Sequence, residues 1–137
     1  MAESGYWRWR FAQAGGLAEI PATAQTVFAA YVRGSAIDLT SAPFRRYRSS
    51  WAAPNDYGET QAIRSVAEAM DVVLIAYESV RDPDRGLCGA VLRPQAFTDR
   101  SPVARETWNL TILPARVLWQ RDGTSLEFPA GTGHWQY

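Results

Sequence analysis

The alternation of apolar and polar positions predicts one strongly patterned helix near the middle of the chain. It begins with a capping box, in which Asp56 is the N-cap and Glu59 follows three positions later. Apolar residues then recur at the spacing of a single helix face, at Ile63, Val66, Ala67 and Met70. We therefore expect a helix from this box to about residue 70.

Before this helix, the pattern predicts a short helix, two extended pieces and a loop. Residues 3–12 can form a helix, which a pair of glycines then breaks. Residues 25–33 are rich in β-branched and aromatic side chains and predict a strand, followed by a second extended piece at 36–40. Residues 41–55 contain prolines and serines, which predict a loop.

After the helix, short apolar runs alternate with turns, as expected for a sheet. Residues 72–77 are continuously apolar, which indicates a strand buried on both faces. A turn at 82–86 separates this strand from another at 87–92, which Pro94 stops. Three more strands are expected at 107–112, 117–120 and 125–128, with a tight turn between the last two.

Length and composition fit one globular domain, since 137 residues is an ordinary domain size. No apolar run approaches the roughly 18–20 residues of a membrane span, and the first residues do not resemble a secretory signal. Cys88 is the only cysteine, which excludes an intrachain disulfide and favours the cytoplasm. We expect a single compact α/β (α+β) domain at residues 1–128, with a central mixed or antiparallel sheet, and a flexible tail at 129–137.

All 14 basic residues are arginine, and 14 acidic residues balance them. The absence of lysine excludes Schiff-base chemistry and a Walker-type phosphate-binding lysine. Zero net charge gives no global attraction to nucleic acid or to an anionic membrane. One local cluster, residues 45–48 with Trp51, mixes arginines with aromatics. It leaves open a nucleic-acid-binding domain that uses the loop from Arg45 to Arg48, although a solvated loop or a partner contact fits as well.

Two polar residues, Ser79 and Arg81, lie where the buried strand meets a turn. Function often occurs at such strand ends, because a rigid backbone positions the side chain beside an open surface. A serine there can hydrogen-bond a ribose hydroxyl, and an arginine can bind a phosphate with two donors. The structural alternative is that Ser79 opens the turn and Arg81 pairs with Asp82 or Asp84.

Tyr57 and Gln61 lie near the start of the central helix, where backbone N–H groups suit phosphate oxygens. The alternative is that Tyr57 packs as a helix staple and Gln61 is solvated. Cys88 and His134 are the only zinc-type donors besides carboxylates, so we expect no metal site. Cys88 also lies in an apolar strand, where a reactive pair with His134 is not expected.

The order of these pieces resembles the RES domain family, named for an arginine, a glutamate and a serine. Many members show D-Y-x-x-x-Q, a helix, a strand ending in Y-x-S-V-R and a strand ending near a proline. The matching residues here are Asp56, Tyr57, Gln61, Tyr77, Ser79, Val80, Arg81, Val91 and Pro94. The family's closing hairpin is similar to the segment with Trp119, Asp122 and Gly123.

The first helix resembles the family's E-x-x-Y-H-R pattern, with Glu3, Tyr6 and Arg8 in place and Trp7 where histidine is common. The family's arginine lies upstream of this helix, in a Gly-Arg-hydrophobic-Asn segment that this sequence does not contain. Loss of such a charged clamp costs about 2–4 kcal/mol of transition-state binding. A catalytically incomplete RES-like binding module is therefore the first alternative to an enzyme.

The resemblance implies an ADP-ribosyltransferase-like fold and the toxin of a toxin–antitoxin pair. Its substrate would be NAD, cleaved by hydrolysis or phosphorolysis or used to transfer ADP-ribose to a protein. Glu3 would act near the ribose, Ser79 would brace it and Arg81 would bind phosphate, with Tyr57, Gln61 and Arg8 lining the same pocket. The implied partner is a DNA-binding antitoxin of the Xre type. Direct binding to nucleic acid is not expected, and a homodimer is left open.

Overall fold

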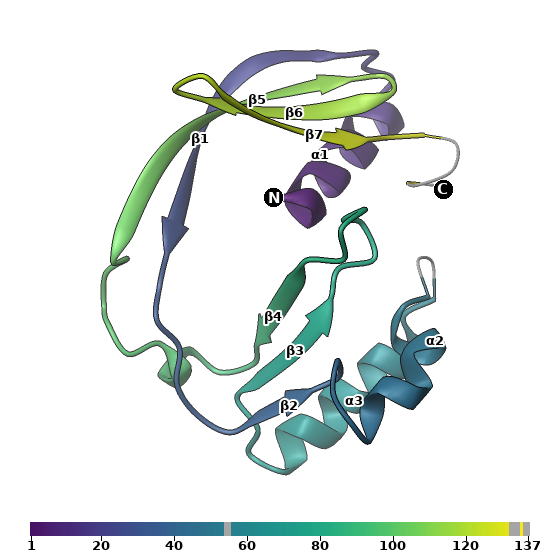
Figure 1. Ribbon diagram of the computed structural model, residues 1–137, viewed down its shortest axis with the longest axis vertical. Helices are drawn as coiled ribbons and strands as arrows, with labels where there is room; N and C mark the ends of the chain where they lie inside the picture. The colour runs from purple at the N-terminus through teal and green to yellow at the C-terminus, as the bar shows by residue number, and fades with distance from the viewer. Residues whose placement is uncertain (54–55, 132–134, 136–137) are drawn as a thin grey trace. The chain divides into compact units, whose positions relative to one another are not determined.

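The computed structural model describes residues 1–53, 56–131 and 135 (Figure 1). Its contacts divide the chain into two compact units, each with its own sheet. Unit 1 consists of Met1–Ala29, Arg81–Pro83 and Ala104–Tyr137. Unit 2 consists of Ala30–Val80 and Asp84–Val103.

Unit 1 contains an antiparallel sheet of four strands in the order β1-β5-β6-β7. The elements are α1 (Ala2–Ala14), β1 (Ile20–Ala29), β5 (Ala104–Leu113), β6 (Arg116–Arg121) and β7 (Thr124–Pro129). The turn between β6 and β7 has positive φ at two successive positions, Asp122 and Gly123. This is the requirement of a type I′ hairpin, whose twist matches that of the flanking strands.

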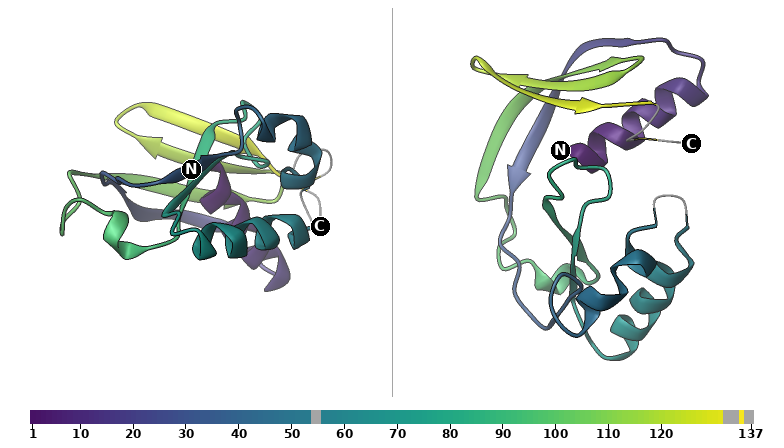
Figure 2. Two further views of the ribbon diagram at one scale, coloured as in Figure 1. Left: turned by 90° about the horizontal axis from the view of Figure 1, so that it is seen from below. Right: turned by 45° about the vertical axis from the view of Figure 1, so that its right-hand side comes forward.

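The helix α1 packs against β5 and β6 through small and aromatic residues (Figure 2). Gly5 allows a close approach, because a Cβ at this position would lie 3.1 Å from Cγ1 of Val117. The indole N–H of Trp9 donates to the carbonyl of Pro114 at 3.1 Å. The buried core of unit 1 comprises Tyr6, Trp9, Ala12, Trp108, Leu110, Ile112, Val117, Trp119 and Trp135.

Unit 2 contains a mixed sheet of three strands, in the order β2-β3-β4. Strand β3 (Leu74–Glu78) pairs in parallel with β2 (Ala36–Asp38) and antiparallel with β4 (Leu87–Val91). The helices are η1 (Phe44–Tyr47), α2 (Arg48–Trp51), α3 (Gly58–Ala69) and η2 (Pro94–Ala96). The buried core of unit 2 comprises Leu39, Ala67, Val72 and Ile75.

The predicted class, α+β with mixed and antiparallel pairing, is confirmed. The strands are divided between two sheets, however, where the sequence predicts one central sheet. Local periodicity indicates that a segment is extended, but it does not say which other strand will pair with it. Pairing between strands far apart in sequence, such as β1 with β5, decides to which of the two sheets a strand belongs.

Two predicted elements, the strand at 25–33 and the loop at 41–55, differ most from the structure in their bounds or type. The strand expected at 25–33 is β1, which begins at Ile20 and ends at Ala29, because its pairing with β5 extends from Ile20 opposite Ile112 to Ala29 opposite Ala104. The loop expected at 41–55 is wrong for its described part, since η1 and α2 lie within it. Short helical turns of four residues leave too weak a periodic signal to predict.

The N-cap of α3 is Tyr57, one residue later than the predicted Asp56. The carboxylate of Asp56 accepts a hydrogen bond from the backbone N–H of Gly58 at 2.9 Å, so it still serves the start of the helix. Of the predicted flexible tail, residues 132–134 and 136–137 lie outside the described residues. Trp135 departs from that expectation, because it is buried in the core of unit 1.

Candidate functional site

Ser79 immediately follows β3 and is only 2% exposed. Its backbone N–H donates to the carbonyl of Gly86 at 2.9 Å, which closes the turn between β3 and β4. Arg85 in that turn has a positive φ of 54°, as tight turns often require. The serine hydroxyl is therefore held on a fixed backbone at the end of a strand, as the sequence predicts.

Glu78, the last residue of β3, forms an ion pair with Arg48 at 2.7 Å. The hydrogen bond from Arg48 lowers the pKa of Glu78, and the charges of Arg48, Arg85 and Arg45 lower it further against the opposing effect of desolvation. This pair borders a small cleft of about 20 Å³, which also includes Tyr77. A cleft of that size holds roughly one water molecule.

Arg81 belongs to unit 1 and is 2% exposed. Its guanidinium carbon lies 3.8 Å from the centroid of the Tyr6 ring, a close cation–π contact. Its backbone carbonyl accepts a hydrogen bond of 2.8 Å from the indole N–H of Trp135. Both the main chain and the side chain of Arg81 are thus held by aromatic residues of the unit 1 core.

Glu3 lies in the first turn of α1 and is half-buried. A carboxylate in a first turn interacts favourably with the positive end of the helix dipole. Arg8 is exposed and follows five residues later. Five residues correspond to about 140° of rotation around a helix, so Glu3 and Arg8 face different directions. The helix does not bring these two predicted site residues together.

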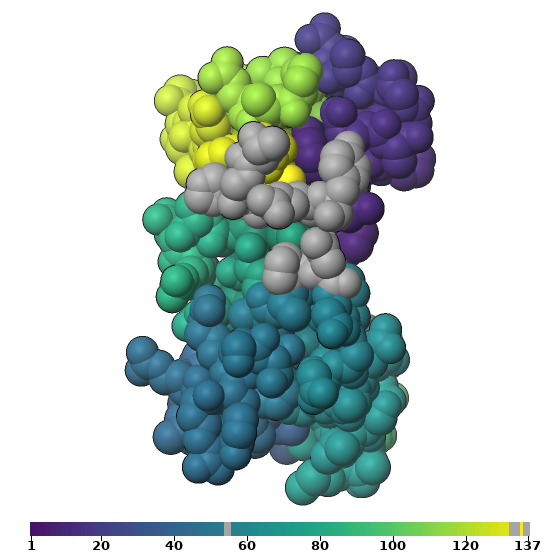
Figure 3. Space-filling model, turned by 90° about the vertical axis from the view of Figure 1, so that its right-hand side faces the viewer, coloured from purple at the N-terminus to yellow at the C-terminus, as the bar shows by residue number. Residues whose placement is uncertain are grey.

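Arg8 instead lines an open groove of about 530 Å³ in unit 1. Trp7 and Phe11 of α1 and Leu110 and Ile112 of β5 also line it. Figure 3 shows the outer surface of α1 in purple. A groove of this size falls within the range of small-molecule sites, but only Arg8 of the predicted site residues lines it.

Tyr57 is the N-cap of α3 and Gln61 lies in its first turn, both in unit 2. The backbone N–H of Gln61 donates to the carbonyl of Tyr57 at 2.8 Å, and both residues are exposed. This backbone bond closes the first turn of α3, so the two residues lie near each other along the chain. That both side chains line an NAD pocket stays a prediction.

A protein-family model, the RES domain, matches residues 1–112. The chain belongs to the RES domain family. No curated protein matches the chain. The matched range contains Glu3, Ser79 and Arg81, and it ends within β5. The sheet of this RES domain continues beyond the match, because β6 and β7 complete it.

The predicted site residues of the RES domain fall in both units. Glu3, Arg8 and Arg81 are in unit 1, whereas Ser79 and the pair on α3 are in unit 2. Within unit 1 the aromatic ring of Tyr6, one turn after Glu3, contacts the guanidinium of Arg81. The convergence of Glu3 and Ser79 on one cavity stays a prediction, as does the domain boundary at residue 128.

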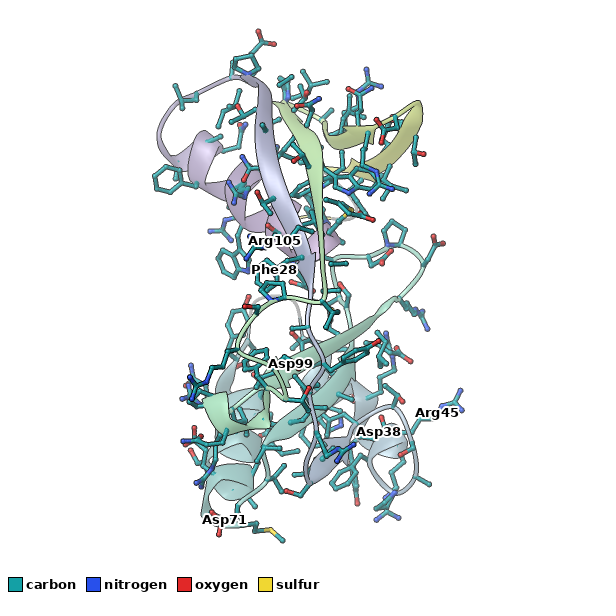
Figure 4. All side chains as sticks on the ribbon, turned by 90° about the vertical axis from the view of Figure 1, so that its left-hand side faces the viewer. Phe28, Asp38, Arg45, Asp71, Asp99 and Arg105 are labelled. Atoms are coloured by element: carbon teal, nitrogen blue, oxygen red, sulfur yellow. The ribbon has the colours of Figure 1, made fainter. Side chains whose placement is uncertain are left out.

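The sequence did not predict three contacts near the candidate site residues. Arg48 pairs with Glu78, next to Ser79, and both Tyr6 and Trp135 contact Arg81. Arg48 lies in a segment whose composition predicts a loop, and its ion pair with Glu78 joins residues 30 positions apart. Figure 4 shows Arg45, in the same segment, projecting away from the ribbon. The E-x-x-Y pattern of the family is the signal for Tyr6, whereas no local signal indicates Trp135.

Within the described parts of the RES domain, no group of three or more histidine, cysteine, aspartate or glutamate side chains could hold a metal ion. Cys88 is half-buried in β4, and His134 lies outside the described residues. None of the helices described is long and apolar enough to cross a membrane.

Proposed function

We propose that this RES domain is a toxin that cleaves NAD at the bond between nicotinamide and ribose. The nicotinamide nitrogen leaves with the electron pair of that bond. The anomeric carbon then bonds to an oxygen of water, phosphate or a protein side chain, which loses its proton. The family match over residues 1–112 carries this proposal, because RES domains are associated with NAD processing in toxin–antitoxin systems.

Glu3 and Ser79 are the proposed catalytic residues. Positive charge develops on the ribose as nicotinamide departs, and a carboxylate near that centre lowers its energy or accepts the proton of the attacking group. A serine hydroxyl can hold a ribose hydroxyl in position during this step. The buried, turn-anchored location of Ser79 suits such a role, because its backbone has little freedom to move.

Arg81 is the proposed ligand of the NAD pyrophosphate, and Tyr57, Gln61 and Arg8 would contribute further binding contacts. Guanidinium groups bind phosphate oxygens with two parallel donors. Because Arg81 is 2% exposed, a phosphate would have to reach it inside a cavity, where charge interactions are stronger than in water.

Nicotinamide release from NAD tests the proposal. Purified protein from the natural gene is incubated with NAD, without phosphate, with phosphate and with a bacterial protein extract, and products are separated by chromatography. We expect nicotinamide in at least one condition, and the second product identifies the acceptor. Ser79→Ala should lower kcat by about 10–100-fold through the lost positioning contact. The exposed Ser101→Ala is the matched control.

If the protein binds NAD but releases nicotinamide under none of the three conditions, the non-catalytic RES-like module is favoured. Isothermal titration with NAD distinguishes that outcome from no recognition of NAD at all. The second alternative is a nucleic-acid-binding domain that uses the loop from Arg45 to Arg48. Its positive charge is partly neutralised, because Arg48 is paired with Glu78. Affinity for single-stranded DNA that falls steeply with salt would support it, and a flat salt response would exclude it.

The partner in this proposal is an antitoxin of the Xre type that blocks the NAD pocket, and the cytoplasm is the proposed compartment. A purified Xre-type protein that binds this chain should stop nicotinamide release at a fixed stoichiometric ratio. Continued release with the two proteins bound to each other would contradict a pocket-blocking partner.

A further inference from the structure

Trp135 lies beyond the range that the family model matches, yet it is one of the most buried residues of unit 1. Its side chain is 1% exposed. The ring meets Tyr6 edge to face at 5.5 Å and stacks with Phe128 at 6.5 Å between centroids. Contacts of this kind with Tyr6 and Trp9 connect the end of the chain to α1. Trp135 therefore contributes to the core that supports the first helix.

The indole N–H of Trp135 has a specific acceptor within this core. It donates to the carbonyl oxygen of Arg81 at 2.8 Å, across 54 positions of sequence, and the bond is buried. A buried hydrogen bond excludes competing water, so losing the donor leaves a desolvated carbonyl. This bond fixes the backbone of the short segment Arg81–Pro83, which belongs to unit 1 although both flanking segments belong to unit 2.

The side chain of Arg81 is controlled through a second aromatic residue. Its guanidinium lies 3.8 Å from the Tyr6 ring centroid, and the edge-to-face contact with Trp135 holds that same ring. The hydroxyl of Tyr6 also accepts a hydrogen bond from Arg10 at 3.0 Å. Trp135 therefore contacts two of the groups that hold Arg81: its backbone carbonyl and the Tyr6 ring that its guanidinium lies over.

We propose that Trp135 is a positioning residue for Arg81. This inference rests on the proposed function, in which Arg81 binds the pyrophosphate of NAD. Without the indole N–H, the Arg81 backbone samples more conformations, and the guanidinium meets the pyrophosphate in a less favourable geometry. The loss falls on NAD binding, because the pyrophosphate lies away from the bond that breaks.

A pair of conservative variants separates positioning from packing. Trp135→Phe removes the indole donor and keeps an aromatic ring. Trp119→Phe is the matched control, because Trp119 is also buried in the unit 1 core and its indole N–H has no hydrogen-bond partner among the residues that the structure describes. Both variants remove the same atoms from the same core. They differ in whether a hydrogen bond to Arg81 is lost.

We expect Trp135→Phe to raise the KM for NAD about 3–10-fold with kcat changed less, and Trp119→Phe to leave KM near the unsubstituted value. Equal KM values in the two variants, at equal loss of thermal stability, would overturn the positioning role. In an Arg81→Lys background the effect of Trp135→Phe on KM should largely disappear, because the bidentate contact is already gone.

Hydrogen–deuterium exchange provides a readout that does not require NAD cleavage. Peptides that cover residues 79–83 should exchange faster in Trp135→Phe than in Trp119→Phe. Unchanged exchange would overturn the proposal even if the enzyme is active. Faster exchange together with no cleavage by the unsubstituted protein would leave the structural clamp intact and reject the proposed function. If Trp135→Phe does not fold, benzothienylalanine at position 135 replaces the N–H by sulfur with little change of shape, and the same outcomes apply.

Discussion

Arg48 and Glu78 join the first residue of α2 to the last residue of β3 through an ion pair of 2.7 Å. The contact lies next to Ser79 in sequence and fixes a helix of only four residues against the strand. Short helices gain little stability from their own backbone hydrogen bonds, so tertiary contacts of this kind determine whether they form. Because Glu78 is titratable, this ion pair depends on pH, and it lies next to the predicted catalytic residue Ser79 in sequence.

Replacing Glu78 by glutamine should reduce the pH dependence of stability in the acid range. The folded-state pKa of Glu78 is lowered, chiefly by the hydrogen bond from Arg48. Its stabilising contribution is therefore present above the unfolded-state pKa, near 4.3, and is lost as pH falls through the lower folded-state pKa. Urea unfolding at pH 7 and pH 3 should give a larger difference between Glu78→Gln and the unsubstituted protein at pH 7. A control variant at the exposed Glu19, Glu19→Gln, should show little difference at either pH. An equal Glu78→Gln deficit at both pH values would contradict the pairing.

Arg121 should resist substitution by lysine because its planar group contacts both acidic and aromatic partners in unit 1. Its guanidinium pairs with Glu106 and lies 4.9 Å from the ring centroid of Trp108, whose indole N–H donates to the same carboxylate at 2.9 Å. Lysine keeps the charge but lacks the planar fork. We expect thermal unfolding midpoints in the order unsubstituted, Arg121→Lys, Arg121→Ala, from highest to lowest. Arg105→Lys, at an exposed site beside Phe28 (Figure 4), should leave the midpoint unchanged.

A side chain at position 34 should destabilise unit 2. Gly34 has a φ of +145°, and an added Cβ would collide with Cγ2 of Val73. Backbone strain and overpacking of this type cost about 1–3 kcal/mol together, so Gly34→Ala should lower the urea midpoint accordingly. Gly16→Ala is the matched control, because its φ of +71° is also positive and no atom lies within 4 Å of the added Cβ. Partial recovery in Gly34→Ala with Val73→Ala would identify the collision as the main cause, and no recovery would assign the effect to strain alone.

Glu3 and Arg8 should have different kinetic effects because they face different directions on α1. Glu3→Gln removes the charge proposed to act in the bond-breaking step, so we expect kcat for nicotinamide release to fall about 10²–10⁴-fold. Arg8→Ala should raise KM and leave kcat nearly unchanged, as expected for a binding contact. The exposed Glu19→Gln controls for removal of an acidic group from unit 1. A kcat for Glu3→Gln within threefold of the unsubstituted enzyme would exclude Glu3 from the chemical step.

Local signals predicted most individual elements correctly. The helix α3 follows from its apolar periodicity, and its start differs by one residue because the side chain of Asp56 serves the cap from just outside. Strand β3 and the β6–β7 hairpin follow from a short apolar run and from an Asp-Gly turn that tolerates positive φ. The short α2 helix was missed, since four residues carry too weak a periodic signal and its contact with Glu78 lies 30 positions away in sequence.

The sequence alone determined which segments are helical or extended and which motifs place the chain in the RES family, because those signals arise from residues within a few positions of one another. Only the tertiary structure decided that the strands form two sheets, that Arg81 joins the core of unit 1, and that Trp135 is its hydrogen-bond donor. The physical reason is that side-chain contacts between sequence-distant residues depend on how whole elements pack, and the periodicity of a single segment carries no record of its partner.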